Sequence, residues 1–206
     1  MNINILKITA ILVLTTCFYC KGPENGFTEA EMEVIYGADS IMRVLTVEDE
    51  NDLTILRSSS TDLSLAALQS DEYDKLAGLM VATVTHPSQD GVGIAGPQIG
   101  INRRIVAVQR FDKEGAPFEV YPNIRIAWAS DSLSTGQEGC LSVPNHRGDV
   151  MRSQEIVIEY ADPSRLEDDD YMVRDTVRGF TAVIFQHEVD HLEGILYIDR
   201  LDLQKR

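Results

Sequence analysis

Two histidines near the end of the chain are the first residues whose type and spacing could do chemistry. They lie in the stretch QHEVDHLEG, residues 186–194, where His187 and His191 flank Glu188. Residues four apart on a helix face the same way, so both imidazoles could bind one metal ion, with Glu188 beside them as a general base. A catalytic zinc ion usually has three protein ligands, so a third ligand is needed elsewhere in the chain.

The residues after this motif do not supply that ligand. The extended protease pattern H-E-x-x-H-x-x-G-x-x-H matches through Gly194, but Tyr197 stands in place of the third histidine. A second protease arrangement takes a glutamate from a later helix, yet the sole glutamate after His191 is Glu193, which is too close. An exported zinc endopeptidase is therefore kept only as an alternative.

A candidate third ligand lies upstream, in QEGCLSVP, residues 137–144. Cys140 follows Gly139, and a glycine there lets the backbone approach a metal closely. One thiolate and two imidazoles leave one position of a tetrahedron open for water or substrate. The alternative for a lone cysteine is a small buried hydrophobic residue.

A glycine-rich stretch, GVGIAGPQIG, occupies residues 91–100. A phosphate-binding loop would need a strand before it and a helix after it, whereas here a predicted helix precedes and a predicted strand follows. With all three motifs in order, the sequence resembles the peptide deformylase family, whose signatures are G-Φ-G-Φ-A-A/G-x-Q, E-G-C-L-S and Q-H-E-x-D-H-L-x-G, where Φ is apolar. The resemblance covers about residues 40 to 200, and Gly96 stands where alanine is more usual.

The resemblance implies an enzyme that hydrolyses the N-formyl group from N-formylmethionyl peptides and releases formate. It implies one divalent metal, Fe(II) first, although a thiolate with two imidazoles also accepts Zn(II), Ni(II) or Co(II). Glu188 would move protons, while the side-chain amide of Gln98 and the backbone N–H of Leu141 would stabilise the developing oxyanion. The implied metal ligands are Cys140, His187 and His191.

Further residues are expected to bind the peptide substrate. Gly93 and Gly139 would let its backbone lie close, and Arg147 would lie near the cleft, with a surface ion pair as the alternative. An ion pair between Asp190 and Arg152 would steady the second helix. The candidates for an apolar pocket around the methionine side chain are Ile94, Phe180, Val183 and Ile184; plain core packing is the alternative for this stripe of the helix.

The elements that must position these residues follow from periodicity and turn signals. Apolar residues at steps of three and four predict a helix over residues 70–86, and a second helix begins near Phe180. Strands are predicted at 104–110, at 118–129 with a break near Pro122, at 155–162 and at 171–179. Residues 44–68 are read as loop with short elements, Thr28 and Glu31 form a capping-box pattern, and a C-terminal helix is short or absent. Consecutive strands mixed with helices indicate an α+β fold, with antiparallel or mixed strands around the HExxH helix.

The first 20 residues have the outline of an export signal, with Lys7 before an apolar run too short to span a bilayer comfortably. The segment LTTC resembles a bacterial lipobox, which makes Cys17 the candidate for lipidation. A redox or zinc pair formed with Cys20 is disfavoured by its place in this apolar segment. We therefore expect an exported, membrane-anchored protein, with an uncleaved signal anchor and a cytoplasmic protein as alternatives.

Composition is ordinary for one folded domain: 206 residues, 44% hydrophobic and 25% charged. The net charge of −15 and the absence of a basic stripe argue against nucleic-acid binding. We expect a linker at residues 21–30 and a single, monomeric catalytic domain at 31–206. The alternative without enzymatic activity is a lipid-anchored binding module of the same fold, against which the intact Glu188 and Gln98 argue.

Overall fold

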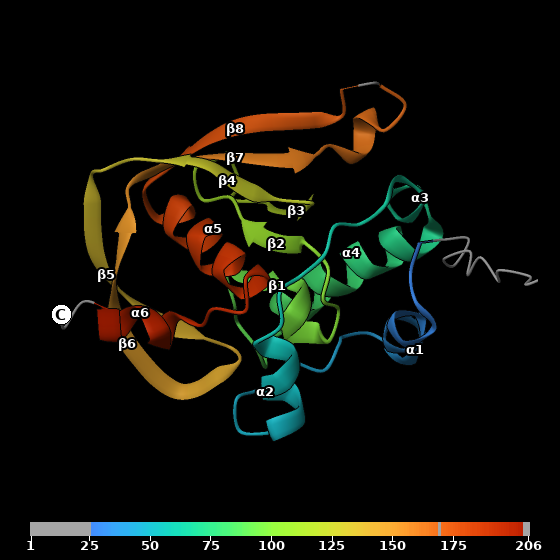
Figure 1. The fold of residues 1–206 in the computed structure, drawn as a ribbon, viewed down its shortest axis with the longest axis horizontal. Coiled ribbons are helices and arrows are strands. Elements are labelled where there is room, and N and C mark those ends of the chain that lie inside the picture. The colour runs from blue at the N-terminus through green and yellow to red at the C-terminus, as the bar shows by residue number, and fades with distance from the viewer. Residues whose placement is uncertain (1–25, 169, 204–206) are drawn as a thin grey trace, which may run out of the picture.

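The computed structural model describes residues 26–168 and 170–203. The predicted export segment with Cys17, and residues 21–25 of the predicted linker, lie outside these residues. Within the described ranges, no helix is both long enough and apolar enough to cross a membrane. The described elements form helices and antiparallel sheets, which confirms the predicted α+β class (Figure 1).

Helices make up the N-terminal part of the fold. The first helix starts within the predicted linker, because Thr28 and Glu31 form the predicted capping box and the helix begins at Glu29. The predicted helix over residues 70–86 is confirmed, with Ser70 as its N-cap. The predicted loop at 44–68 contains two short helices. These elements are α1 (Glu29–Gly37), α2 (Glu50–Leu56), α3 (Leu65–Leu68) and α4 (Asp71–Val84).

Two three-stranded antiparallel sheets follow. The first has the order β1-β2-β3 and the second the order β4-β7-β8. The predicted strand at 118–129 is broken after Pro122, where Asn123 adopts a φ of 54°, and its two halves join different sheets. The strands are β1 (Gly93–Ala95), β2 (Ile105–Gln109), β3 (Phe118–Pro122), β4 (Arg125–Ala129), β7 (Glu155–Ala161) and β8 (Met172–Arg178), with 3-10 turns η1 (Gly96–Ile99) and η2 (Pro163–Arg165).

A long hairpin of β5 (Leu133–Cys140) and β6 (Val143–Ser153) was not among the predicted elements. Its first strand, LSTGQEGC, contains two glycines and several polar residues, and most of its positions are exposed. Strand prediction relies on alternating apolar side chains, and this hairpin has few of them. Its pairing depends instead on main-chain hydrogen bonds to its partner.

Helix α5 (Gly179–Leu192) is the centre of the molecule, and nearly all of its residues are buried. Figure 1 shows it enclosed by the β4-β7-β8 sheet, the β1-β2-β3 sheet and the β5–β6 hairpin. Phe185, Val189 and Leu192 pack in one hydrophobic core with residues from β2, β7 and β8. The C-terminal helix α6 (Tyr197–Leu203) is short and packs on the hairpin, where Leu201 covers Gly148.

Candidate active site

Cys140, His187 and His191 come together although the cysteine and the histidines lie on different elements. Their ligand atoms all lie within 4.8 Å of one another. The two histidines occupy successive turns of α5, and Cys140 ends β5, with its Sγ 3.2 Å from Nε2 of His191. This is the arrangement that the proposed metal ligands require.

The donor set fits a divalent metal. His191 is 1% exposed, and its Nδ1 has no hydrogen-bond partner among the described residues. Burial raises the pKa of the Cys140 thiol, but the adjacent His191 and His187 outweigh burial and hold that pKa well below its usual value. A thiolate beside two imidazoles is a soft donor set that suits iron(II), zinc and related ions.

Glu138 is a site residue that the sequence reasoning missed. Its Oε2 lies 2.8 Å from Nδ1 of His187, and a carboxylate can only accept, so Nδ1 carries the proton and Nε2 is free for a metal. Burial raises the pKa of Glu138, yet hydrogen bonds from His187 and Arg152 lower it to about 2. Strand alternation could have found it, since residues two apart on a strand face the same side and Glu138 is two before Cys140.

A network of charged side chains extends from Glu138 away from the histidines. Arg152 donates to both oxygens of Glu138, at 2.8 and 3.0 Å, and also to Asp190 at 2.5 Å. Arg200 of α6 donates to Asp190 in turn, through Nε at 3.0 Å. The predicted Arg152–Asp190 pair is confirmed, and it is buried rather than a surface pair. This network of ion pairs connects α6, β6 and α5 to the side chain of His187.

Glu188 faces the cavity next to these ligands. It is 4% exposed, and its Oε2 has no hydrogen-bond partner among the described residues. Burial raises the pKa of Glu188 to about 7, although the neighbouring His187 and His191 act to lower it. A Cβ at Gly93 would collide with this carboxylate and would lie 2.9 Å from Cγ2 of Ile184. Gly93 therefore leaves the space that Glu188 and a substrate need.

Gln98 is held in a fixed orientation by η1. Its Oε1 accepts from the backbone N–H of Ala95 at 2.8 Å, and its Nε2 donates to Ser142 Oγ at 3.2 Å and to Cys140 Sγ at 3.5 Å. The amide group thus points toward the metal ligands. Glycine is required at Gly96, where a Cβ would lie 2.5 Å from the carbonyl oxygen of Ile101, so the departure from alanine leaves this loop intact.

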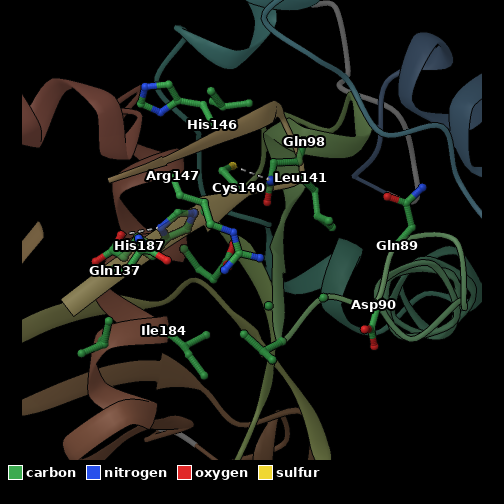
Figure 2. A pocket seen from close by; sticks show the side chains of 18 of the residues that line it. Gln89, Asp90, Gln98, Gln137, Cys140, Leu141, His146, Arg147, Ile184 and His187 are labelled. Atoms are coloured by element: carbon green, nitrogen blue, oxygen red, sulfur yellow. Dashed lines mark hydrogen bonds and ion pairs between the residues drawn. The ribbon is translucent and has the colours of Figure 1, made fainter. Parts of the chain in front are cut away.

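One cavity of about 700 Å³ joins these groups (Figure 2). Figure 2 shows Gln98 joined to Cys140 by a dashed line, with Leu141, Arg147, Ile184 and His187 around the same cavity. His191, the third residue of the Cys–His–His cluster, is buried and is not part of the cavity lining. The predicted site residues that line the cavity are Gly93, Gln98, Gly139, Cys140, Leu141, Arg147, Phe180, Val183, Ile184, His187 and Glu188.

Ile94 is not part of this lining, and its predicted place in the methionine pocket is corrected. It is fully buried in the core that β1 shares with α4. Neighbouring residues of a strand point to opposite faces, so Gly93 faces the cavity and Ile94 faces the core.

Tyr197, which stands where a zinc protease would have its third histidine, lies against His187. The two rings are stacked with centroids 6.0 Å apart, and the Tyr197 hydroxyl is 2.7 Å from Nδ1 of His146. Tyr197 is 1% exposed, whereas His146 is exposed at the rim of the cavity. Tyr197 supports a ligand and does not join the ligand cluster.

Comparison with known proteins gives consistent matches. A family model described as polypeptide deformylase matches residues 41–206. Peptide deformylase of Leptospira biflexa is 38% identical over 158 residues, which is 73% of this chain and 84% of that protein. The actinonin-bound class I type b peptide deformylase from Acinetobacter baumannii is 34% identical, with a TM-score of 0.67 over 79% of this chain and 99% of that one. Peptide deformylase from Thermotoga maritima is 28% identical, with a TM-score of 0.66 over 79% of this chain and 99% of that one.

Proposed function

The chain belongs to the peptide deformylase family and is a hydrolase that removes the N-formyl group from N-formylmethionyl peptides, and we propose that Cys140, His187 and His191 hold its metal. The observation that carries this proposal is the convergence of their ligand atoms, within 4.8 Å of one another, at a cavity that Glu188 and Gln98 also face. A structural metal site would need neither a free carboxylate nor an oriented amide beside it.

Fe(II) is the proposed metal, as the family resemblance implies, and the same donors accept Zn(II), Ni(II) or Co(II). When bound, a divalent metal lowers the pKa of a water molecule toward neutrality and so supplies hydroxide. Glu138 fixes the orientation of His187 for this role through the hydrogen bond to Nδ1. Replacing Cys140 with alanine is expected to abolish tight metal binding, and an unchanged metal content after dialysis would remove Cys140 from the ligand set.

Glu188 is the proposed general base and acid. Its carboxylate lies on the cavity wall one residue from a ligand, with one oxygen unpartnered among the described residues. It would take the proton from water and pass it to the leaving amine, a step that commonly contributes about 10²–10⁴-fold in rate.

Gln98 and Leu141 are the proposed oxyanion donors. The Gln98 amide already points at the thiolate side of the site, because Ala95 and Ser142 hold both of its ends. The backbone N–H of Leu141 follows the ligand Cys140 directly in the chain. Each such donor is commonly worth about 2.7–4 kcal/mol in the transition state.

The peptide substrate would bind alongside β1, which is an edge strand of its sheet. An extended peptide pairs readily with such an edge, and Gly93 allows close approach. Structures similar to this one include a peptide deformylase bound to Met-Ala-Ser and another bound to actinonin. The methionine side chain would then enter between Phe180, Val183 and Ile184, with Arg147 across the cleft.

Formate release tests the function directly. The Fe(II)-loaded full-length protein, kept in mild detergent, is expected to release formate from formyl-Met-Ala-Ser and to leave acetyl-Met-Ala-Ser intact, because the tight site admits only the smallest acyl group. Cleavage of an internal peptide bond without formate release would favour the zinc endopeptidase. Metal binding without either activity would favour the inactive binding module.

The proposal extends to location. The lipobox-like LTTC segment supports export and membrane attachment through Cys17. Radiolabelled palmitate should then label the wild-type chain in cells and fail to label Cys17→Ser. Equal labelling of both, or recovery of unlabelled protein from the cytoplasm, would contradict lipid attachment at this residue.

A further inference from the structure

The contacts between β5 and α5 repeat at a regular interval. Glu138 meets His187 at 2.8 Å, and two residues later Cys140 meets His191 at 3.2 Å. Two strand residues advance about 6.6 Å and four helix residues advance about 6 Å, so the two elements stay in step. One step back along both elements are Gly136 and Val183, which line one common space.

Gly136 offers no side chain to fill this position. A Cβ built there would meet no atom within 4 Å, whereas the next residue on the same face, Glu138, is buried against His187. The space in front of Gly136 is a second cavity of about 400 Å³, which we call the Gly136 cavity. Its walls include Ser134, Gly136, Val150, Gly179, Phe180 and Val183.

The Gly136 cavity adjoins the active-site cavity. Gln137, Phe180 and Val183 line both, so these three residues form a wall that the two spaces share. Phe180 is 57% exposed, and its ring is tilted against that of Phe111 with centroids 5.4 Å apart. This part of the shared wall is therefore a largely exposed side chain that can change rotamer and let a longer substrate side chain past. The surface of the Gly136 cavity is mostly apolar, and Val150, which pairs with Gly136 in the hairpin, forms part of it.

We propose that the Gly136 cavity extends the subsite for the first side chain of the substrate, so that the enzyme accepts N-formyl peptides whose first residue carries an unbranched apolar side chain longer than methionine. This inference rests on the proposed function, because the side chain reaches the cavity only when the formyl group lies at Cys140, His187 and His191. Gly136 is then the residue that sets the accepted length, since any side chain there would occupy the extension.

Paired substrates test the proposal in the full-length, metal-loaded enzyme. We compare kcat/KM for formyl-Met-Ala-Ser with that for the same peptide carrying 2-aminodecanoic acid in place of methionine. In the wild-type enzyme, kcat/KM for the longer substrate is expected to be within about threefold of kcat/KM for the methionine substrate. Gly136→Val should lower the ratio of these two kcat/KM values by about tenfold or more. Tenfold is the lower end of what one methylene contributes in an apolar pocket. Gly136→Ala should give an intermediate ratio.

Thr135→Val is the control, because it places the same residue type, valine, at the adjacent position, which points to the opposite face of β5. Its ratio should equal that of the wild type. Gly136 lies in mid-strand and is not among the glycines with positive φ, so its backbone accepts valine. If the valine variant is unstable, Gly136→Ala still tests the proposal. Equal ratios in wild type and both Gly136 variants, or failure of the wild type on the long substrate alone, would overturn the extended subsite. Absence of formate from both substrates would overturn the proposed function and the subsite with it.

Discussion

Glu138 connects the proposed metal ligands to the charged interior of the protein. One of its oxygens orients His187, and Arg152 holds both oxygens from the other side. All three side chains are buried, and the hydrogen bonds from His187 and Arg152 keep the Glu138 carboxylate ionised although burial opposes its charge. The orientation of His187, a proposed metal ligand, is therefore set by Glu138, which is not itself one of the proposed ligands.

Replacement of Glu138 by glutamine is expected to weaken metal binding by about 10–100-fold, because the amide is a poorer partner for the Nδ1 proton and leaves Arg152 under-paired. The dissociation constant can be measured by competition with a coloured chelator. Glu155→Gln is the control, since Glu155 pairs with Arg178 on the surface of the other sheet. Equal affinities in the two variants would contradict the orienting role.

Glu188→Gln should retain the metal and lose turnover by about 10²–10⁴-fold, because the amide keeps the shape of the carboxylate but cannot accept a proton. Metal content by elemental analysis and formate release are measured on the same preparation. Glu159→Gln, at a partly exposed position of β7, should change neither quantity. Substantial activity in Glu188→Gln would mean that another group moves the proton.

At the scale of elements, an ion pair between Glu31 and Arg103 adds to the packing that joins α1 to the body of the protein. Glu31 accepts from Arg103 at 2.5 and 2.9 Å and also from the backbone of Thr28 at 2.7 Å. Burial raises the pKa of Glu31, but the hydrogen bonds from Arg103 and Thr28 lower it below the ordinary value of 4.5. This pair thus stabilises the folded state only while Glu31 is ionised.

Because the folded pKa of Glu31 is below its unfolded value, its stabilisation is complete above about pH 4.5 and is lost as pH falls through the folded pKa. Glu31→Gln should therefore melt at a lower temperature than wild type near neutral pH, and the difference should shrink below pH 4.5. Thermal melts across this pH range measure it. Glu33→Gln, on the exposed side of the same helix, is the control and should show no such convergence. A difference that grows toward low pH would contradict the assignment.

At the scale of the whole molecule, the proposed metal joins elements that pack separately. Cys140 lies at the end of the β5–β6 hairpin, and the histidines lie on α5, within a different part of the core. A ligand that binds only the folded state stabilises it by RT ln(1 + [L]/Kd), about 4.1 kcal/mol at a thousandfold excess over Kd. The hairpin and α5 should thus be most firmly joined when the metal is bound.

Removal of the metal by a chelator is accordingly expected to lower the melting temperature by about 10 °C at that excess, given about 2–4 °C per kcal/mol for a chain of this size. Calorimetry before and after dialysis against chelator measures the shift, and added Fe(II) or Zn(II) should reverse it. Cys140→Ala serves as the control and should respond weakly to added metal. An equal response in Cys140→Ala would place the stabilising ion elsewhere.

The sequence by itself determined the reaction and most of its residues. The three motifs carry their functional groups at short, fixed spacings, so local geometry on a strand end, a 3-10 turn and a helix is enough to suggest roles for Gln98, Cys140 and His187. Helices α4 and α5 were predicted in part because their apolar residues repeat with the helical period or follow strong start signals. The predicted export segment stays a prediction, because it lies outside the described residues.

Only the tertiary structure decided how these pieces meet. The β5–β6 hairpin lacks an apolar alternation, so its existence depends on pairing between strands, and with it the approach of Cys140 to α5. Three further features depend on neighbours distant in sequence. These are the side of β1 on which Ile94 lies, the buried ion pairs of Glu138 with Arg152, and the space in front of Gly136. Sequence spacing defines what one element presents, whereas packing between elements decides what each presented group touches.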